Sequence, residues 1–199
     1  ADCSQRAGNY PAPAGDSQIL GLEGSGYIVD ENGIPDTSRP VMALLPGGGY
    51  AQYAVVPKDH VMDIPKGISV EDGSAIPEVW LTALKLLNVT QAKENEWVLI
   101  YGAASGVGSA AIQLVKKYIK GNVVALAGTD EKCLIAKNFG ADVTINYKTT
   151  QNLSQKIREA TGDKGVNVIL DPVGAQNFEL SISSLALDGR WVIYGWLGG

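Results

Sequence analysis

The feature that most constrains this chain is a strand, a glycine-rich turn and a helix in direct succession. Residues 97–101 are aliphatic or aromatic, as in a buried parallel strand, and residues 109–117 carry apolar side chains at helical spacing. Gly102, Gly106 and Gly108 lie between this strand and the helix. Free N–H groups and the dipole at a helix start attract phosphate, and glycines leave room for its approach. The segment is therefore a candidate site for a nucleotide pyrophosphate.

The glycine spacing alone is weak evidence, because the chain contains 24 glycines. The dinucleotide pattern G-x-G-x-x-G, aligned with this turn, places its glycines at Ala103, Ser105 and Gly108, so only the last one matches. A plain tight turn remains an alternative. The segments that follow favour nucleotide binding, since strands and helices alternate to the end of the chain.

That alternation predicts a doubly wound α/β domain, a Rossmann sheet of parallel strands with helices on both faces. Ligands bind such sheets beyond the carboxyl ends of the strands. Gly102, Gly128, Tyr147, Pro172 and Gly195 fall at these ends, although turn chemistry alone also explains glycine and proline there. The expected strands are 123–127, 143–146, 166–170 and 191–194, and the expected helices are 130–139, 152–160 and 175–184.

The first part of the chain has a different pattern, of short strands typical of an antiparallel sheet. We expect strands at 19–29, 41–45, 50–56 and 61–65, with a loop at 30–40. Ser69 begins a capped helix, and a second helix covers residues 78–87. The change in pattern predicts two domains, 1–77 and 78–199.

Composition excludes several classes of function. The net charge of −5 and the lack of a dense basic run make a nucleic-acid partner unexpected. No apolar run is long enough to span a membrane and no signal pattern is present, so we expect a cytoplasmic protein. Cys3 and Cys133 are interpreted as free thiols, and His60 as a solvated turn residue, so no metal site is predicted.

The end of the second strand of a dinucleotide fold selects the cofactor, because an acidic residue there binds the ribose 2′-hydroxyl and repels a 2′-phosphate. Ala127 occupies this position, and Gly128, Thr129 and Lys132 follow it. This arrangement favours NADPH over NADH. Asp130 is the contrary evidence, although it is more simply explained as the N-cap of the next helix.

These residues lie within a series of motifs that resembles the quinone oxidoreductase branch of the medium-chain dehydrogenase/reductase superfamily, the zeta-crystallin relatives. The motifs are spread over almost the whole chain and occupy residues 2–10, 20–26, 44–49, 75–83, 104–108 and 186–192. The resemblance implies a partial GroES-like β-barrel catalytic domain before the Rossmann domain. It also implies hydride transfer from NADPH to quinones or activated enones without zinc. Leu22 stands where zinc-dependent relatives have a histidine ligand.

The resemblance also assigns roles to individual positions. Tyr10 is the candidate catalytic residue, as proton donor or substrate orienter. The candidate cofactor-binding residues are Thr82 at the carboxamide, Ala104, Ser105, Gly106, Val107 and Gly108 at the pyrophosphate, Gly128, Thr129 and Lys132 at the 2′-phosphate, Tyr147 at the adenosine, and Gly195. Packed aromatic residues and an ordinary helix threonine are the alternatives for Tyr10, Tyr147 and Thr82.

The chain departs from this family in length, since relatives have further residues at both ends. We therefore expect a fragment with an incomplete barrel, and a homodimer is possible. The alternative function is a catalytically weak, crystallin-like NADPH-binding protein with a structural or RNA-binding role. A metal-dependent alcohol dehydrogenase is a more distant alternative.

Overall fold

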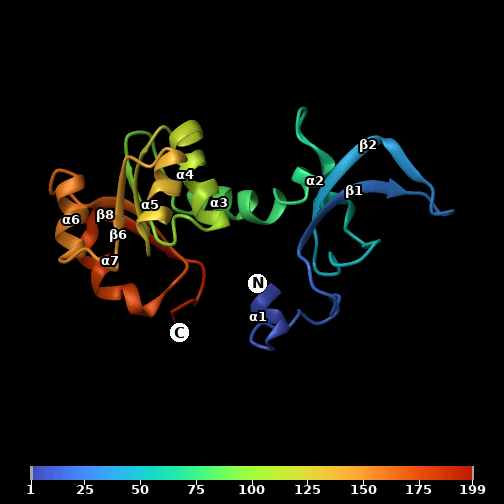
Figure 1. The fold of residues 1–199 in the computed structure, drawn as a ribbon, viewed down its shortest axis with the longest axis horizontal. Coiled ribbons are helices and arrows are strands. Elements are labelled where there is room, and N and C mark those ends of the chain that lie inside the picture. Colours follow the sequence, from blue (N-terminus) through green and yellow to red (C-terminus); the bar gives the residue numbers. More distant parts are fainter. Residues whose placement is uncertain (1, 199) are drawn as a thin grey trace. The chain divides into compact units, whose positions relative to one another are not determined.

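Figure 1 shows the computed structural model, in which residues 2–198 are described. The chain forms two compact units, Ala1–Leu81 and Thr82–Gly199, and the division falls inside helix α3 (Pro77–Val89). The expected boundary between residues 77 and 78 stays a prediction.

The first unit contains a three-stranded antiparallel sheet in the order β1-β2-β3. The partial barrel that the resemblance implies stays a prediction, because the described residues of this unit form only this open sheet. Ser69 caps the helix that follows, as predicted, by accepting a hydrogen bond from the Asp72 N–H. The elements are α1 (Asp2–Arg6), β1 (Glu23–Val29), β2 (Pro35–Leu44), η1 (Lys58–His60), β3 (Val61–Asp63) and α2 (Val70–Gly73).

The strand predicted at residues 50–56 is wrong, because these residues have no strand structure. Tyr50 and Tyr53 are exposed, and Val55 is 93% exposed. Aromatic and β-branched residues favour a strand where a neighbouring strand and a buried face are available. This segment has neither of them.

The loop predicted at residues 30–40 is also partly wrong, because Pro35 already begins β2. The two strands form a hairpin, in which Pro40 lies opposite Tyr27. The Asp30 carboxylate closes the turn by accepting hydrogen bonds from the N–H groups of Asn32 and Ile34, at 2.9 and 2.8 Å. Proline and polar residues therefore belong to an exposed strand end here.

The second unit contains five parallel strands in the order β6-β5-β4-β7-β8. The chain runs outward from β4 through β5 to β6, and then returns to the other side of β4. Strand order therefore reverses between β4 and β7, which confirms the predicted doubly wound α/β sheet. The strands are β4 (Trp97–Ile100), β5 (Asn122–Ala127), β6 (Val143–Asn146), β7 (Val166–Asp171) and β8 (Leu185–Ile193).

Helices connect these strands with small shifts from the predicted bounds. The helix predicted at 109–117 begins earlier, at Gly106, and its end is a π-helical turn. Strand β8, predicted at 191–194, begins earlier, at Leu185. The helices are α4 (Gly106–Leu114), η2 (Val115–Ile119), α5 (Asp130–Asn138), α6 (Leu153–Ala160), η3 (Ala175–Asn177) and α7 (Phe178–Ser184).

Both faces of the parallel sheet are buried. Ile157 of α6 and Leu180 of α7 pack on the face formed by alternate strand residues such as Leu99 and Val124. Residues of the opposite parity, among them Ile100, are also fully buried. Burial of each such aliphatic side chain contributes about 1.5–3 kcal/mol, which makes the sheet a stable platform for the loops at its carboxyl edge.

Arg190 of β8 binds the segment that leads into β4. Its Nη1 and Nη2 atoms donate to Glu96 Oε1 and Oε2 at 2.9 and 2.5 Å, and its Nε donates to the Thr90 carbonyl at 2.8 Å. The side chains are partly buried, at 32% exposure for Arg190 and 16% for Glu96. This bidentate pair therefore connects an outer strand of the sheet to its centre.

Candidate functional site

The candidate site lies at the carboxyl edge of the parallel sheet. The five residues predicted at strand ends each follow a different strand, and the sheet brings all five to one edge. They are Gly102, Gly128, Tyr147, Pro172 and Gly195. Reversal of strand order between β4 and β7 opens the crevice in which dinucleotides bind such folds.

The turn after β4 presents free backbone donors. Ser105 is the N-cap of α4, and its Oγ accepts a hydrogen bond from the Gly108 N–H at 3.1 Å. The N–H groups of Ala104, Gly106 and Val107 have no hydrogen-bond partner within residues 2–198. Three free donors at the positive end of a nine-residue helix are an arrangement that favours an anion.

Two glycines give this turn its shape. Gly102 has φ +60°, a conformation that costs glycine little. A β-carbon on Gly108 would lie 2.5 Å from the Gly102 carbonyl oxygen and 2.8 Å from the Ala103 Cα. The helix start therefore packs directly on the turn, which is the role of the third glycine in dinucleotide folds.

A second cluster lies at the ends of β5 and β6. The Tyr147 hydroxyl is 2.7 Å from the position that a β-carbon of Gly128 would occupy, so the missing side chain makes room for the tyrosine. Lys148 Cε is 3.5 Å from the same position. The structure thus brings predicted residues 128 and 147 together and adds Lys148, which the sequence analysis missed. Its signal was a cation directly after Tyr147 at a strand end.

The interpretation of Asp130 as an N-cap is wrong. Thr129 is the N-cap of α5, with its Oγ1 accepting from the Lys132 N–H at 3.2 Å. Asp130 is the first helical residue, and its Oδ1 accepts from Asn146 Nδ2 at 2.7 Å. Because β6 supplies this amide donor, the carboxylate is bound at the sheet edge. Lys132 is exposed on the first turn of the same helix.

The remaining predicted residues belong to other elements of the chain. Gly195 follows β8, and a β-carbon on it would lie 2.7 Å from the Pro172 carbonyl oxygen. Thr82 is a half-buried residue of α3. Tyr10 lies in the first unit and is 51% exposed. The roles of these three residues stay predictions.

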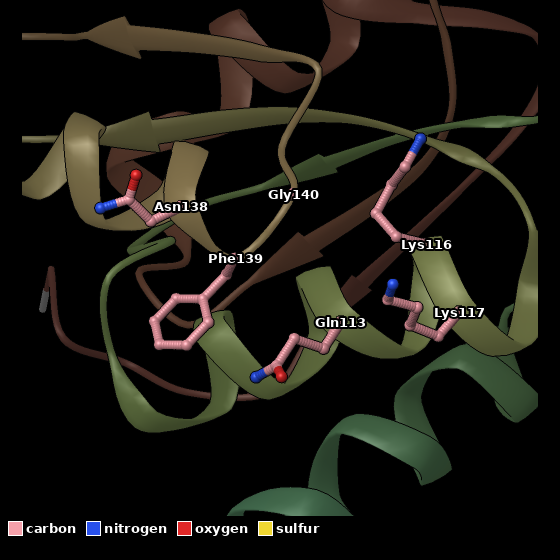
Figure 2. Close-up of a pocket in the computed structure, with 6 residues that line it drawn as sticks. All are labelled: Gln113, Lys116, Lys117, Asn138, Phe139 and Gly140. Carbon is pink, nitrogen blue, oxygen red and sulfur yellow. The ribbon is translucent and has the colours of Figure 1, made fainter.

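A surface hollow of about 400 Å³ lies away from this edge. Figure 2 shows its lining, with Gln113, Lys116 and Lys117 on one side and residues at the end of α5 on the other. The Lys116 Nζ donates to the Asp142 carboxylate and to the Gly121 carbonyl, each at 2.9 Å. These two partners precede β6 and β5, so the hollow adjoins the amino edge of the sheet, where dinucleotides do not bind.

Neither a metal cluster nor a spanning helix is found in the part of the chain that the structure describes. No group of three His, Cys, Asp or Glu side chains in residues 2–198 could hold a metal ion. Leu22 offers no donor atom at the position of the zinc-ligand histidine. None of the described helices is long and apolar enough to cross a membrane.

Comparison with known proteins agrees with this geometry. The family model described as zinc-binding dehydrogenase matches residues 106–199. Quinone oxidoreductase-like protein 2 of Bos taurus is 32% identical over 183 residues, covering 90% of this chain and 52% of the relative. The chain therefore spans about half the length of that relative.

Two solved structures share the fold. The quinone oxidoreductase of Pseudomonas syringae pv. Tomato DC3000 has a TM-score of 0.84 at 31% identity, covering 100% of this chain and 62% of that chain. The Escherichia coli quinone oxidoreductase complexed with NADPH has a TM-score of 0.83 at 30% identity, covering 98% and 60%. These matches confirm the resemblance to the quinone oxidoreductase branch of the medium-chain dehydrogenase/reductase superfamily that the sequence motifs predicted.

Proposed function

We propose that the chain binds NADPH and belongs to an enzyme that transfers hydride from it to quinones or activated enones. The observation that carries this proposal is the set of free N–H groups of Ala104, Gly106 and Val107 at the start of α4. The similarity to an NADPH-bound quinone oxidoreductase supports it.

The residues at the carboxyl edge fit this cofactor. The free N–H groups after β4 would hold the pyrophosphate. The Tyr147 hydroxyl and Lys148, which lie against Gly128, would contact the adenosine ribose with its 2′-phosphate. Thr129 and Lys132, at the start of α5, would complete this end. None of these proposed contacts to the cofactor involves a metal ion.

NADPH, when bound, supplies a hydride, which is two electrons and one proton, and a quinone becomes a hydroquinone by taking that hydride and one further proton. The role of this chain's residues is to hold the cofactor in a fixed position. We assign the proton to the Tyr10 hydroxyl, which is half-exposed and can regain a proton from water. Thr82 and Gly195 are assigned to the nicotinamide end.

The test is titration of the chain with NADPH and NADH, followed by NADPH oxidation with ortho-quinones, para-quinones and enones. We expect tighter binding of NADPH than of NADH, and turnover with at least one quinone or enone. Equal affinities would contradict the 2′-phosphate assignment. Binding without turnover on any acceptor would leave a cofactor-binding protein and remove the reductase.

We further propose a small-molecule substrate as the partner, with no nucleic acid, and a cytoplasmic location. A homodimer stays a prediction. Sedimentation of the chain with and without NADPH measures the oligomeric state. Salt-sensitive retention on RNA would contradict the proposal of no nucleic-acid partner, which rests on the net charge of −5.

A further inference from the structure

A completely buried carboxylate lies at the end of β7. Asp171 has 0% exposure. Its Oδ1 accepts hydrogen bonds from the N–H groups of Val173 and Gly174 at 2.7 and 3.1 Å and from Asn177 Nδ2 at 3.4 Å. Its Oδ2 accepts from Trp191 Nε1 at 3.2 Å. All four partners are neutral donors, which is the environment of an ionised carboxylate acting only as an acceptor.

This charge has no cationic partner. None of the ion pairs found in residues 2–198 includes Asp171. An isolated carboxylate in a protein interior is costly, and hydrogen bonds from neutral donors offset only part of the cost. A neutral polar residue could make hydrogen bonds in the same loop without this cost, so closure of the loop does not by itself explain why the residue is charged.

Asp171 joins two loops at the carboxyl edge. Its own carbonyl accepts from the Tyr194 N–H at 2.9 Å, and the Pro172 and Val173 carbonyls accept from the Leu197 and Gly198 N–H groups, each at 3.0 Å. The loops after β7 and β8 therefore form one backbone layer directly above the carboxylate.

The sheet order places this layer under one half of the crevice. The pyrophosphate cradle follows the central strand β4, and the Gly128 and Tyr147 cluster follows β5 and β6 on one side. A dinucleotide spans both halves of such a sheet. With its adenosine over β5 and β6, its nicotinamide half extends over β7 and β8, above Asp171.

The neighbouring polar side chains do not compensate the charge. Burial, together with the negative charge of Asp171, raises the pKa of Tyr101 to about 12, although the hydrogen bond between Tyr101 and Ser181 lowers it. Burial, and then the same carboxylate, raise the pKa of Tyr194 to about 12. Both phenols are therefore neutral at physiological pH, and both respond to the field of Asp171.

We propose that Asp171 is a positioning residue whose buried negative charge stabilises the oxidised, cationic nicotinamide relative to the neutral reduced ring. The inference rests on the proposed function. Loss of a hydride leaves one positive charge on the ring, and a fixed anion below the crevice attracts that charge without contact. Asp171 thus favours hydride donation, and its effect appears in the ratio of the two cofactor affinities.

The test compares two variants, Trp191→Phe alone and Trp191→Phe combined with Asp171→Asn. Trp191 is replaced in both, because the NH₂ group of an asparagine at position 171 would otherwise face the Trp191 N–H. We measure dissociation constants of NADP⁺ and NADPH for Trp191→Phe and for the double variant. We expect the double variant to lose about three- to tenfold more affinity for NADP⁺ than for NADPH.

Two further variants separate charge from geometry. Asp171→Glu keeps the charge and should keep the wild-type ratio even if both affinities fall, so a ratio like that of the double variant would overturn the proposal. Gln176→Glu adds a charge on the exposed part of the same loop and should shift the ratio toward NADP⁺, by about twofold. This variant decides the question if the double variant does not fold, since an unchanged ratio would overturn the proposal.

Failure of the underlying function gives a different result. If wild-type protein binds neither NADPH nor NADP⁺, the proposed function is wrong. If it binds both and the double variant has the ratio of Trp191→Phe, only the role of Asp171 is wrong. A shift in favour of NADP⁺ in the double variant would contradict the sign of the effect.

Discussion

The hydroxyl of Tyr147 occupies the space that a side chain at Gly128 would need. The distance from this oxygen to an ideal β-carbon on Gly128 is 2.7 Å, which is shorter than the contacts that real β-carbons make. Strands β5 and β6 therefore place a phenol over a bare backbone at the carboxyl edge, and this contact depends on one missing methyl group.

Gly128→Ala should weaken NADPH binding with little loss of stability. The alanine displaces the end of the Tyr147 side chain, which can rotate away at small cost. The Tyr147 hydroxyl then leaves the cofactor site. We expect about tenfold weaker binding in a fluorescence titration. Gly26→Ala, at a glycine with nothing within 4 Å, is the control and should bind normally. Unchanged NADPH affinity in Gly128→Ala would remove this contact from the cofactor site.

The charge at the N-cap of α4 should control binding independently of the cap. Asp and Asn both cap helices as well as serine does, so Ser105→Asp and Ser105→Asn should have melting temperatures near that of the wild type. Ser105→Asp places a negative charge beside the free N–H groups. It should bind NADPH at least about tenfold more weakly than Ser105→Asn by calorimetric titration. Equal binding by the two variants would mean that no phosphate lies at this turn.

Lys132→Ala should weaken NADPH by about 1–3 kcal/mol and leave NADH nearly unchanged, because only NADPH carries the 2′-phosphate. Parallel titrations with both cofactors check this. Lys137→Ala, on the last turn of the same helix, is the matched control. Should Lys132→Ala be silent while Lys148→Ala weakens NADPH selectively, the phosphate contact belongs to Lys148. Equal losses of NADPH and NADH would contradict both assignments.

Arg190→Leu should destabilise the second unit by about 2–3 kcal/mol, because it removes the bidentate pair with Glu96 and the bond to the Thr90 carbonyl. Arg39→Leu breaks a more exposed pair, with side chains 56% and 69% exposed, and should cost less than about 1 kcal/mol. Urea denaturation of both variants gives the comparison. Equal losses would show that the partial burial of the Arg190 pair adds nothing.

The same pair should make stability depend on pH. Burial alone would raise the pKa of Glu96, but the hydrogen bonds from Arg190 and from the Lys93 N–H outweigh it and hold the pKa below its usual 4.5. The contribution of Glu96 is therefore complete above pH 4.5 and is lost as pH falls toward the lowered pKa. Arg190→Leu should flatten this acid limb of the stability profile.

The parallel sheet could be predicted because its strands are buried on both faces and read as continuous apolar runs. The segment 50–56 has a similar composition and no such burial, so composition alone misassigned it. Asp130 shows the limit for single residues, since Thr129 and Asp130 are both good N-caps and only the backbone decides between them.

The cofactor cradle was predictable from order in the chain, whereas the contacts across strands were not. The contact between Lys148 and Gly128 depends on the pairing of β5 with β6. The bond from Trp191 to Asp171 depends on the register of β7 and β8, and no local sequence pattern marks it. Ser105 was predicted as a ligand contact, and the structure gives its hydroxyl a role within the turn itself.

Close backbone packing at Gly108 has a consequence for the thermodynamics of binding. The start of α4 rests on the Gly102 carbonyl, so the free N–H groups have one arrangement before any ligand arrives. Binding an anion there loses little conformational entropy. That entropy is lost during folding instead. A side chain at position 108 would therefore reduce the yield of folded protein more than it reduces the anion affinity of the protein that does fold.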